Sequence, residues 1–516
     1  MSVQWASVET SAPFLRYPCF APEEIEKGIF RFLNRTVDLK GRIDWSAPET
    51  DRLWIYNLHY FHYLPGTLEA GAGFRLISDW IRHNPPGTKD SWDPFPISLR
   101  LVNWIKFLTD ISSAETLPGE VLGSAHLQAL WLERSLEYRL LGNHLFKNAK
   151  ALVFCGLFFR GDDAKRWLAK GTAILKRELE EQILPDGGHF ERSPMYHSMI
   201  LEDCLDLLNI STNREDKALR ELSGMLRERI PSMMEFLTGM THPDGQIALF
   251  NDAAFGIEAA PAQLAGYYQE VFGEAAPALL DSSRSFSHSG YFVMSPRPGE
   301  RMIIDAGPIG PDYQPGHAHS DTLSFELSIE GHRVVVDSGC FQYEDGPIRR
   351  YNRGNAGHNT VTIDGRNQSE VWGAHRCARR ARPLHAEIEQ KGGDIIFRGA
   401  HDGYRRLKGK PVHHRQVVRT GRSYFIEDRV EGDGAHRVES RLHIHPDLDL
   451  DWTSDEVSVK YKGEFLAAIS SVQGQVIEKE EGWYCPEFGV KRPCSVLKIS
   501  LPEAALPCRT GWVIRT

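Results

Sequence analysis

Histidine and aspartate side chains gather in one part of this chain, with types and spacing that suit metal binding or acid–base chemistry. GHAHSDTLSFELSIEGHRVVVDSG places His317, His319 and Asp321 before one expected strand, and Asp337 at the end of the next. His358 opens a third expected strand in GHNTVTIDG. Imidazole nitrogens with one carboxylate suit Zn²⁺ or a similar divalent ion. Each histidine alone would be a hydrogen-bonded structural residue, but the joint spacing favours a metal. Because His317 and His319 share a face in extended backbone, both could coordinate, or one could face a substrate.

A second polar segment, DGGHFERSPMYHSMILEDCLDLL, surrounds the expected start of an apolar helix. Its polar side chains are Asp186, His189, Glu191, Arg192, Tyr196 and His197. A helix N-terminus offers unpaired N–H groups and positive potential, so this spot suits an anionic ligand. Capping explains Ser193 and Pro194. It does not explain Tyr196 or His197, so we expect a site here.

Two further features of the N-terminal part suit a binding cleft. Asn143 and His144 interrupt the apolar stretch LLGNHLFKNAKALVF. A buried amide beside a buried imidazole costs free energy unless both have partners, so we expect them to line a cleft; an interhelical hydrogen bond is the alternative. Trp92, in SWDPFPISLRLVNW, could offer a flat face to a sugar ring or could fill the space between helices.

The elements that must position these residues change type along the chain. From about residue 20 to 280, apolar residues recur at the helical period and Pro–Gly or Asp–Gly turns separate the segments. After about residue 285, short alternating or β-branched runs such as RMIIDAG and HRQVVRT indicate an antiparallel sandwich. We therefore predict a helical domain at 1–284 and an antiparallel β-sandwich domain at 285–516.

Composition narrows the functional classes. The 516 residues carry a net charge of −9, which argues against a general nucleic-acid binder. No apolar stretch approaches the ~20 residues of a membrane-spanning helix. The first residues show no signal peptide, which predicts a cytoplasmic protein, or a periplasmic or secreted one if a leader was removed. The eight scattered cysteines are expected to be free thiols.

The sequence resembles the heparinase II/III family of polysaccharide lyases along nearly its whole length. The motifs that carry the resemblance are NHLFKNAKAL, GGHFERSPMYH, GHAHSDTLSFEL, VVVDSG and RYNRGNAGHNTVTIDGRNQSEVWG. The resemblance implies an N-terminal incomplete (α/α) toroid of helical hairpins followed by a C-terminal antiparallel β-sandwich. It also implies cleavage of an acidic polysaccharide or oligosaccharide, either a glycosaminoglycan or a bacterial exopolysaccharide.

The resemblance also assigns roles by position. Tyr196 would be the catalytic tyrosine and His317 its partner, and Asn143 with His144 would neutralise the uronate carboxylate. One divalent metal, expected to be zinc, would be held by three ligands, namely His319, Asp337 and His358. Substrate contacts would come from Tyr351 and Arg353, and we add Glu191, Arg192 and Trp92 as candidates.

β-Elimination removes the C5 proton of a uronate and expels the C4 oxygen. The usual pKa of tyrosine is ~10, so Tyr196 suits the acid role directly. As a base it would need nearby positive charge, for which His317 and Arg192 are candidates. Two alternatives remain. HAHSD is similar to the HxHxD strings of zinc hydrolases, although Thr322 follows Asp321 here. A non-catalytic glycan-binding protein on the same scaffold is the third interpretation.

Overall fold

A computed structural model describes residues 4–16, 20–39, 43–111, 116–212, 214–278 and 282–516. The chain divides into two compact units. Unit 1 comprises residues 1–183, 200–230 and 263–276, and unit 2 comprises 184–199, 231–262 and 277–516. No helix among the described residues is long and apolar enough to cross a membrane.

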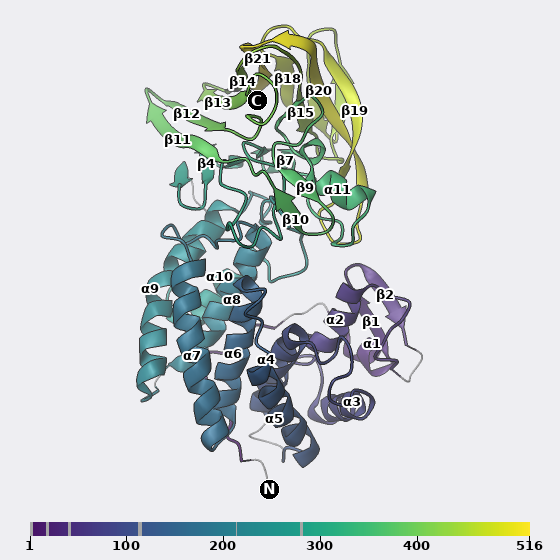
Figure 1. Cartoon of the computed structure of the whole chain (residues 1–516), viewed down its shortest axis with the longest axis vertical. Helices are drawn as coiled ribbons and strands as arrows, with labels where there is room; N and C mark the ends of the chain where they lie inside the picture. Colours follow the sequence, from purple (N-terminus) through teal and green to yellow (C-terminus); the bar gives the residue numbers. More distant parts are fainter. Residues whose placement is uncertain (1–3, 17–19, 40–42, 112–115, 213, 279–281) are drawn as a thin grey trace. The chain divides into compact units, whose positions relative to one another are not determined.

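Unit 1 is built from helices and one small hairpin (Figure 1). Its elements are α1 (Pro22–Glu26), β1 (Ile29–Phe32), β2 (Arg35–Asp38), α2 (Arg52–Tyr60), α3 (Ala70–His83), α4 (Pro94–Ile111), α5 (Gly119–Arg134), α6 (Gly142–Phe158), α7 (Asp162–Gln182), most of α8 (Pro194–Ser211), the first part of α9 (Lys217–Gly239) and most of α10 (Pro261–Phe272). Helices α4 and α6 are buried along most of their length, which explains why their sequences are apolar with little amphipathic pattern.

Buried ion pairs join three of these helices. Lys106 of α4 lies 2.6 Å from Asp206 of α8, and Lys150 of α6 lies 2.5 Å from Asp206 and 2.7 Å from Asp203. All four side chains are nearly inaccessible to solvent. Removing one partner of such a pair leaves a buried charge uncompensated, so the set fixes how the helices pack.

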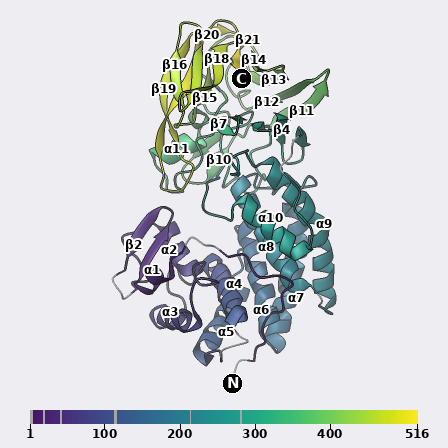
Figure 2. The same ribbon diagram turned by 180° about the vertical axis from the view of Figure 1, so that it is seen from behind.

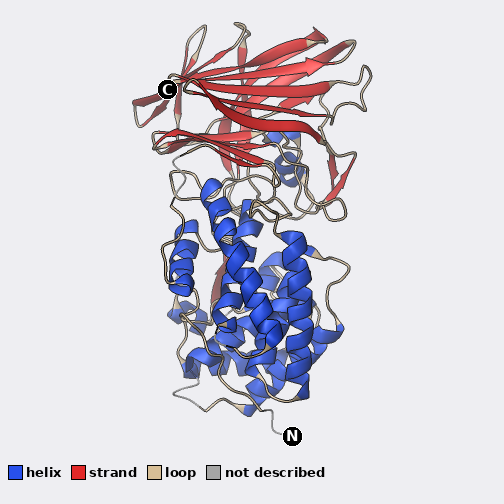
Figure 3. Ribbon diagram, turned by 90° about the vertical axis from the view of Figure 1, so that its left-hand side faces the viewer, coloured by secondary structure: helices blue, strands red, loops and turns tan. Residues whose placement is uncertain are grey.

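Unit 2 consists mainly of antiparallel sheets, drawn in red in Figure 3. The five-stranded sheet contains β3 (Arg284–Phe286), β4 (Tyr291–Arg297), β5 (Glu300–Asp305), β6 (Phe325–Ile329) and β7 (His332–Val335). The eight-stranded sheet has the order β11 (Pro383–Lys391), β12 (Asp394–His401), β13 (Val412–Thr420), β14 (Ser423–Glu431), β21 (Cys508–Arg515), β18 (Glu464–Ser471), β17 (Val457–Tyr461) and β16 (Asp449–Trp452), with β16 visible from behind (Figure 2).

Two smaller sheets complete unit 2. One has the order β19 (Ile477–Tyr484), β20 (Arg492–Ala505), β15 (Ala435–His443) and β8 (Val361–Ile363). The other is the hairpin of β9 (Glu370–Trp372) and β10 (Arg376–Ala378). The short helix α11 (Pro347–Arg353) and the 3₁₀ turn η1 (Asn355–Gly357) precede β8.

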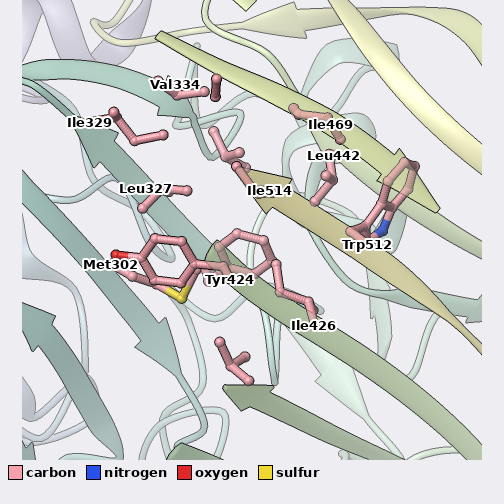
Figure 4. Close-up of a cluster of buried hydrophobic side chains, with 14 of the residues drawn as sticks. Met302, Leu327, Ile329, Val334, Tyr424, Ile426, Leu442, Ile469, Trp512 and Ile514 are labelled. Atoms are coloured by element: carbon pink, nitrogen blue, oxygen red, sulfur yellow. The ribbon is translucent and has the colours of Figure 1, made fainter. Parts of the chain in front are cut away.

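The core of unit 2 lies between the five-stranded and eight-stranded sheets. Met302 and Leu327 of the first meet Tyr424, Trp512 and Ile514 of the second in one buried cluster (Figure 4). Burial alternates along β13 and β14, as the sequence pattern predicted for strands with one face on the core.

The division into units differs from a single boundary near residue 284. Segments 184–199 and 231–262 belong with the sheets, to which polar contacts and, for 231–262, a buried apolar cluster join them. His242, for example, lies 2.8 Å from the Glu326 carboxylate on β6. Asp186 accepts hydrogen bonds from the backbone N–H and the hydroxyl of Ser289. A sequence pattern of helices alone does not reveal such long-range contacts.

Candidate active site

Tyr196 lies in the first turn of α8, within unit 2. Ser193 caps this turn: its hydroxyl accepts from the Tyr196 backbone N–H at 3.3 Å and donates to the Asp252 carbonyl at 2.7 Å. The cap therefore fixes the start of α8 and fastens it to the turn that bears Asp252. The Tyr196 ring lies 3.9 Å, centroid to centroid, from the imidazole of His317. Its hydroxyl is 2.9 Å from that of Tyr343, so three ring side chains meet here.

His317 lies between two carboxylates. Its Nδ1 is 3.0 Å from Oδ2 of Asp252, and its Nε2 is 3.6 Å from Oε2 of Glu191. The His317 side chain keeps 13% exposure, whereas both carboxylates are nearly inaccessible. His317 is thus the member of this group that remains open to solvent.

Asp252 is the centre of the cluster. Its carboxylate accepts hydrogen bonds from His317, from Nε2 of His319 at 2.8 Å, and from both terminal nitrogens of Arg349. Burial alone would raise the pKa of Asp252, but the Arg349 guanidinium and the hydrogen bonds from both histidines hold that pKa well below its usual value. Asp252 is therefore an ionised acceptor, and His317 must donate through Nδ1.

This hydrogen bond sets the chemistry of His317. With the proton of neutral imidazole held on Nδ1, Nε2 carries a lone pair. Burial raises the pKa of Tyr196 well above its usual value; the hydrogen bond with Tyr343 opposes the rise, and the negative charges of Asp252 and Glu191 add to it. The arrangement therefore presents a phenol that keeps its proton beside an imidazole that can accept one.

A second, fully buried cluster lies next to the first. Ligand atoms of His319, Asp321 and His358 all lie within 4.8 Å of one another. Nε2 of His319 donates to Asp252, and Nδ1 of His358 lies 2.7 Å from Oδ2 of Asp337. The remaining nitrogens, Nδ1 of His319 and Nε2 of His358, have no hydrogen-bond partner among the described residues.

These residues fit a divalent metal. Two unpartnered imidazole nitrogens and a carboxylate converge, and each imidazole is held through its other nitrogen by a carboxylate, which is the usual outer arrangement around metal-bound histidine. Of the three predicted ligands, His319 and His358 are brought together. The predicted ligand Asp337 contacts His358, and Asp321 contributes the carboxylate of the converging group. Burial raises the pKa of Asp337 to about 6.

Three predicted substrate contacts, Trp92, Arg192 and Arg353, make packing contacts or hydrogen bonds within the protein. Trp92 is 5% exposed, donates to the Asn84 carbonyl and packs against the Trp80 ring, so it belongs to the core of unit 1. Arg192 donates to the carbonyls of Phe190, His288 and Ser289. Arg353 is 1% exposed and donates to the carbonyls of Ala318, Trp372, Gly373 and Arg376. A guanidinium has five N–H donors, so these contacts fix the position of each arginine, and the predicted substrate contacts of both stay predictions.

The other predicted residues lie as follows. The Tyr351 hydroxyl is 2.9 Å from Nε2 of His443 and accepts from the Trp483 backbone N–H, and its predicted substrate contact stays a prediction. Asn143 and His144 occupy the first turn of α6 in unit 1. Asn143 is buried, and His144 lies 3.0 Å from Glu137.

Sequence reasoning missed several members of the cluster. Asp252 had one local signal, an Asn–Asp pair that interrupts the apolar run IALFNDAAF. Asn251, with φ of 58°, accepts from the His319 backbone N–H and so holds the His319 loop against Asp252. Arg349 stood out only as part of a basic segment, and Tyr343 had no signal, since its contact with Tyr196 spans 147 residues.

The chain is similar in sequence to proteins of one known family. Two family models match, Heparinase II/III N-terminus over residues 74–276 and Heparinase II/III-like, C-terminal over residues 279–513. A heparin-sulfate lyase of Pedobacter heparinus is 25% identical, with 82% of this chain and 66% of that relative covered. A Caulobacter vibrioides protein named FtsZ-localized protein C is 24% identical, with 81% and 74% covered.

Among solved structures, a crystal structure of heparinase III has a TM-score of 0.72 at 19% identity, covering 93% of this chain and 80% of that one. The predicted fold class, a helical N-terminal part followed by antiparallel sheets, is thereby confirmed. The two matching models together cover most of the sequence, and the chain belongs to the heparinase II/III family.

Proposed function

We propose that this protein is a polysaccharide lyase that cleaves an acidic, uronate-containing glycan by β-elimination. The observation that carries the proposal is the contact of Tyr196 with His317, whose Nδ1 is held by the buried Asp252 carboxylate. The heparin-sulfate lyase name of the Pedobacter relative supports a sulfated glycosaminoglycan as the first substrate class to examine.

The reaction needs an acid at the departing oxygen. Tyr196 suits this role because burial raises the pKa of its hydroxyl, so the phenol keeps its proton at neutral pH. In the proposed step the C4–O bond breaks, its electron pair goes to the oxygen, and the phenol proton follows. The Tyr343 hydroxyl, 2.9 Å away, orients the Tyr196 hydroxyl. A positioned acid–base group of this kind contributes ~10² to 10⁴-fold to rate.

The reaction also needs a base at C5. His317 suits this role because its Nδ1–H donates to Asp252, which leaves the Nε2 lone pair to accept the C5 proton. The electron pair of the broken C–H bond forms the C4–C5 double bond as the C4–O bond breaks. Asp252 then stabilises the imidazolium that forms, and Arg349 keeps Asp252 in place.

The uronate carboxylate must be neutralised while the C5 proton leaves. We propose Asn143 and His144 for this task on the chemistry of their donors, as the family resemblance implies. They begin α6, where unpaired backbone N–H groups also favour an anion. Preorganised donors of this type are worth ~3 to 4 kcal/mol each when they are removed from other enzymes.

We also propose a divalent metal, most suitably Zn²⁺, held by His319 and His358 with Asp321 or Asp337. When bound, the ion would link the loop before β6 to the start of β8 and so stabilise the fold. Asp252 contacts both His317 and His319, so this link also fixes His317. The proposed role is structural, and no proton transfer in the reaction depends on it.

The test is incubation with heparan sulfate, chondroitin sulfate, hyaluronate, alginate and polygalacturonate, each followed by near-ultraviolet absorbance. A lyase generates an absorbing C4–C5 double bond, and Tyr196→Phe should abolish the signal while heparan sulfate binding is retained. If the polymer shortens without new absorbance, the protein is a hydrolase. If a polymer binds and stays intact, the protein is a binding module.

One observation favours the hydrolase as the second candidate. Asp252, His317 and His375 bring ligand atoms within 4.8 Å of one another, which would suit a metal that activates water. Against it, both oxygens of Asp252 already accept hydrogen bonds from Arg349.

A further inference from the structure

The β9–β10 hairpin reaches the candidate active site with its tip. The Ala374 carbonyl at this tip accepts from Nε of Arg349 at 3.1 Å and from the NH2 nitrogen at 2.8 Å, and Arg349 is the residue that holds Asp252. His375 lies 6.1 Å from His317 and 5.4 Å from Tyr343 between ring centroids. The hairpin lies beside α11 in the fold (Figure 1). Its position relative to the catalytic pair is therefore fixed within unit 2.

The two residues that flank the tip form a pair on one face of the hairpin. Trp372 and Arg376 are directly opposite each other in the antiparallel register, so their side chains lie side by side. Trp372 is 51% exposed, although large aromatic side chains are usually buried. Arg376 is also exposed, and its guanidinium pairs with no carboxylate in the part of the chain that the structure describes.

The surrounding segment is basic in a chain that is acidic overall. Residues 370–382 contain four arginines and one glutamate, whereas the whole chain carries a net charge of −9. Glu370 is 3.0 Å from Arg379 and 3.7 Å from Arg406, and Asp312 is 3.2 Å from Arg380 and 3.8 Å from Arg382, so two carboxylates face five arginines here. The local positive charge therefore exceeds what the neighbouring carboxylates neutralise, and it lies next to the candidate active site.

We propose that Trp372 and Arg376 form a substrate subsite, in which the indole face stacks on a sugar ring and the guanidinium binds a carboxylate or sulfate of the same chain of sugars. A planar guanidinium suits bidentate recognition of such anions. An exposed indole offers a rigid apolar face beside it. The ligand class is an acidic, preferably sulfated, polysaccharide, and this assignment rests on the proposed lyase function.

The hairpin also explains how binding could be coupled to catalysis. Arg376 directly follows His375, and Trp372 directly precedes Gly373, whose carbonyl accepts from Arg353. A polymer bound at Trp372 and Arg376 would therefore place its neighbouring sugar units beside Tyr196 and His317. The subsite would hold the polymer next to the cleaved linkage without contributing a reacting atom.

The experiment compares Trp372→Ala and Arg376→Gln with two controls, Trp452→Ala and Arg437→Gln. The controls remove an exposed tryptophan on β16 and an exposed arginine on β15, both in unit 2. Kinetics are measured on heparan sulfate, and affinity is measured by calorimetry in the Tyr196→Phe background, which keeps the polymer intact. We expect each hairpin variant to raise KM and Kd about five- to tenfold, with kcat within about twofold of wild type, and the controls to change neither. Arg376→Gln should also weaken the salt dependence of Kd.

The outcomes separate the subsite from the lyase function. Unchanged Kd and KM in both hairpin variants of an active lyase would overturn the subsite alone. Polymer that binds through Trp372 and Arg376 but is never cleaved would leave the subsite standing and overturn the lyase function. If none of the five polymers tested for the proposed function binds or is cleaved, both proposals are overturned.

Discussion

Asp252→Asn is expected to abolish most of the activity because the amide cannot replace what the carboxylate does. Both oxygens of Asp252 accept, one from His319 and Arg349 and the other from His317 and Arg349. An amide offers one oxygen and one NH2 group, so in either orientation an NH2 faces the guanidinium. If this NH2 group also faces Nδ1 of His317, Nδ1 must accept a hydrogen bond and the imidazole carries its proton on Nε2. His317 then has no lone pair on Nε2 with which to take the C5 proton.

The size of both effects follows from these contacts. Loss of the oriented tautomer should lower kcat by ~10² to 10⁴-fold. Arg349 is 0% exposed, and leaving this charge uncompensated should cost about 3–5 kcal/mol of unfolding free energy. The assay is the initial rate of ultraviolet-absorbing product per folded enzyme, with stability measured by urea denaturation.

Asp428→Asn is a matched control for this change. Asp428 is also buried, with its carboxylate 2.8 Å from Nε2 of His413 and 2.7 Å from Nε of Arg415, but no catalytic role is proposed for it. It should lose comparable stability while kcat per folded molecule stays within about threefold of wild type. If both variants lose kcat by the same factor, or if Asp252→Asn retains more than a tenth of kcat, the proposed positioning role of Asp252 is wrong.

Three further results are expected. Elemental analysis should show metal in wild type and in His317→Ala but little in His319→Ala or His358→Ala. Chelation should lower the melting temperature. Equal metal loss in all three variants would contradict the division of roles between His317 and His319. Burial lowers the pKa of His197 to about 3 in the folded protein. As pH falls below ~6.5, His197 is protonated in the unfolded state but not in the folded state, so the folded state loses stability between pH ~6.5 and about pH 3. The free energy of unfolding of the wild type should fall by roughly 2 kcal/mol from this group between pH 7 and pH 5. Urea denaturation at both pH values should show a smaller fall in His197→Gln. An equal fall in wild type and variant would mean that His197 has an ordinary pKa in the folded protein. Trp92→Ala should destabilise the protein by about 3–5 kcal/mol with unchanged KM, and a selective rise in KM would restore its role as a sugar platform.

The local patterns in the sequence predicted the elements well. Alternation in HHRQVVRT and the helical period before residue 280 reflect which face each element buries, and this property is encoded within a few residues. The proximity of Tyr196 and His317 followed only from the family resemblance, because they are far apart in sequence. Once the segment 184–199 is folded with the sheets, the two rings lie in contact.

The residues that were missed show the limit of local patterns. Arg192 and Arg353 are the kind of residue that binds anions, but whether a guanidinium faces solvent or backbone carbonyls depends on distant loops. Asp252 had only the Asn–Asp pair as a local signal, because its cited side-chain partners come from two distant segments, one with His317 and His319 and one with Arg349. Trp372 and Arg376 gain significance only from the register that pairs them.

The most direct test of the central claim is to cleave the polymer that proves to be the substrate in ¹⁸O-labelled water and weigh the products. β-Elimination breaks the C4–O bond without water, so the account predicts products that carry no ¹⁸O at the new ends, with one unsaturated uronate per cleavage. Incorporation of one ¹⁸O per cleavage, without the unsaturated sugar, would show hydrolysis and contradict the account.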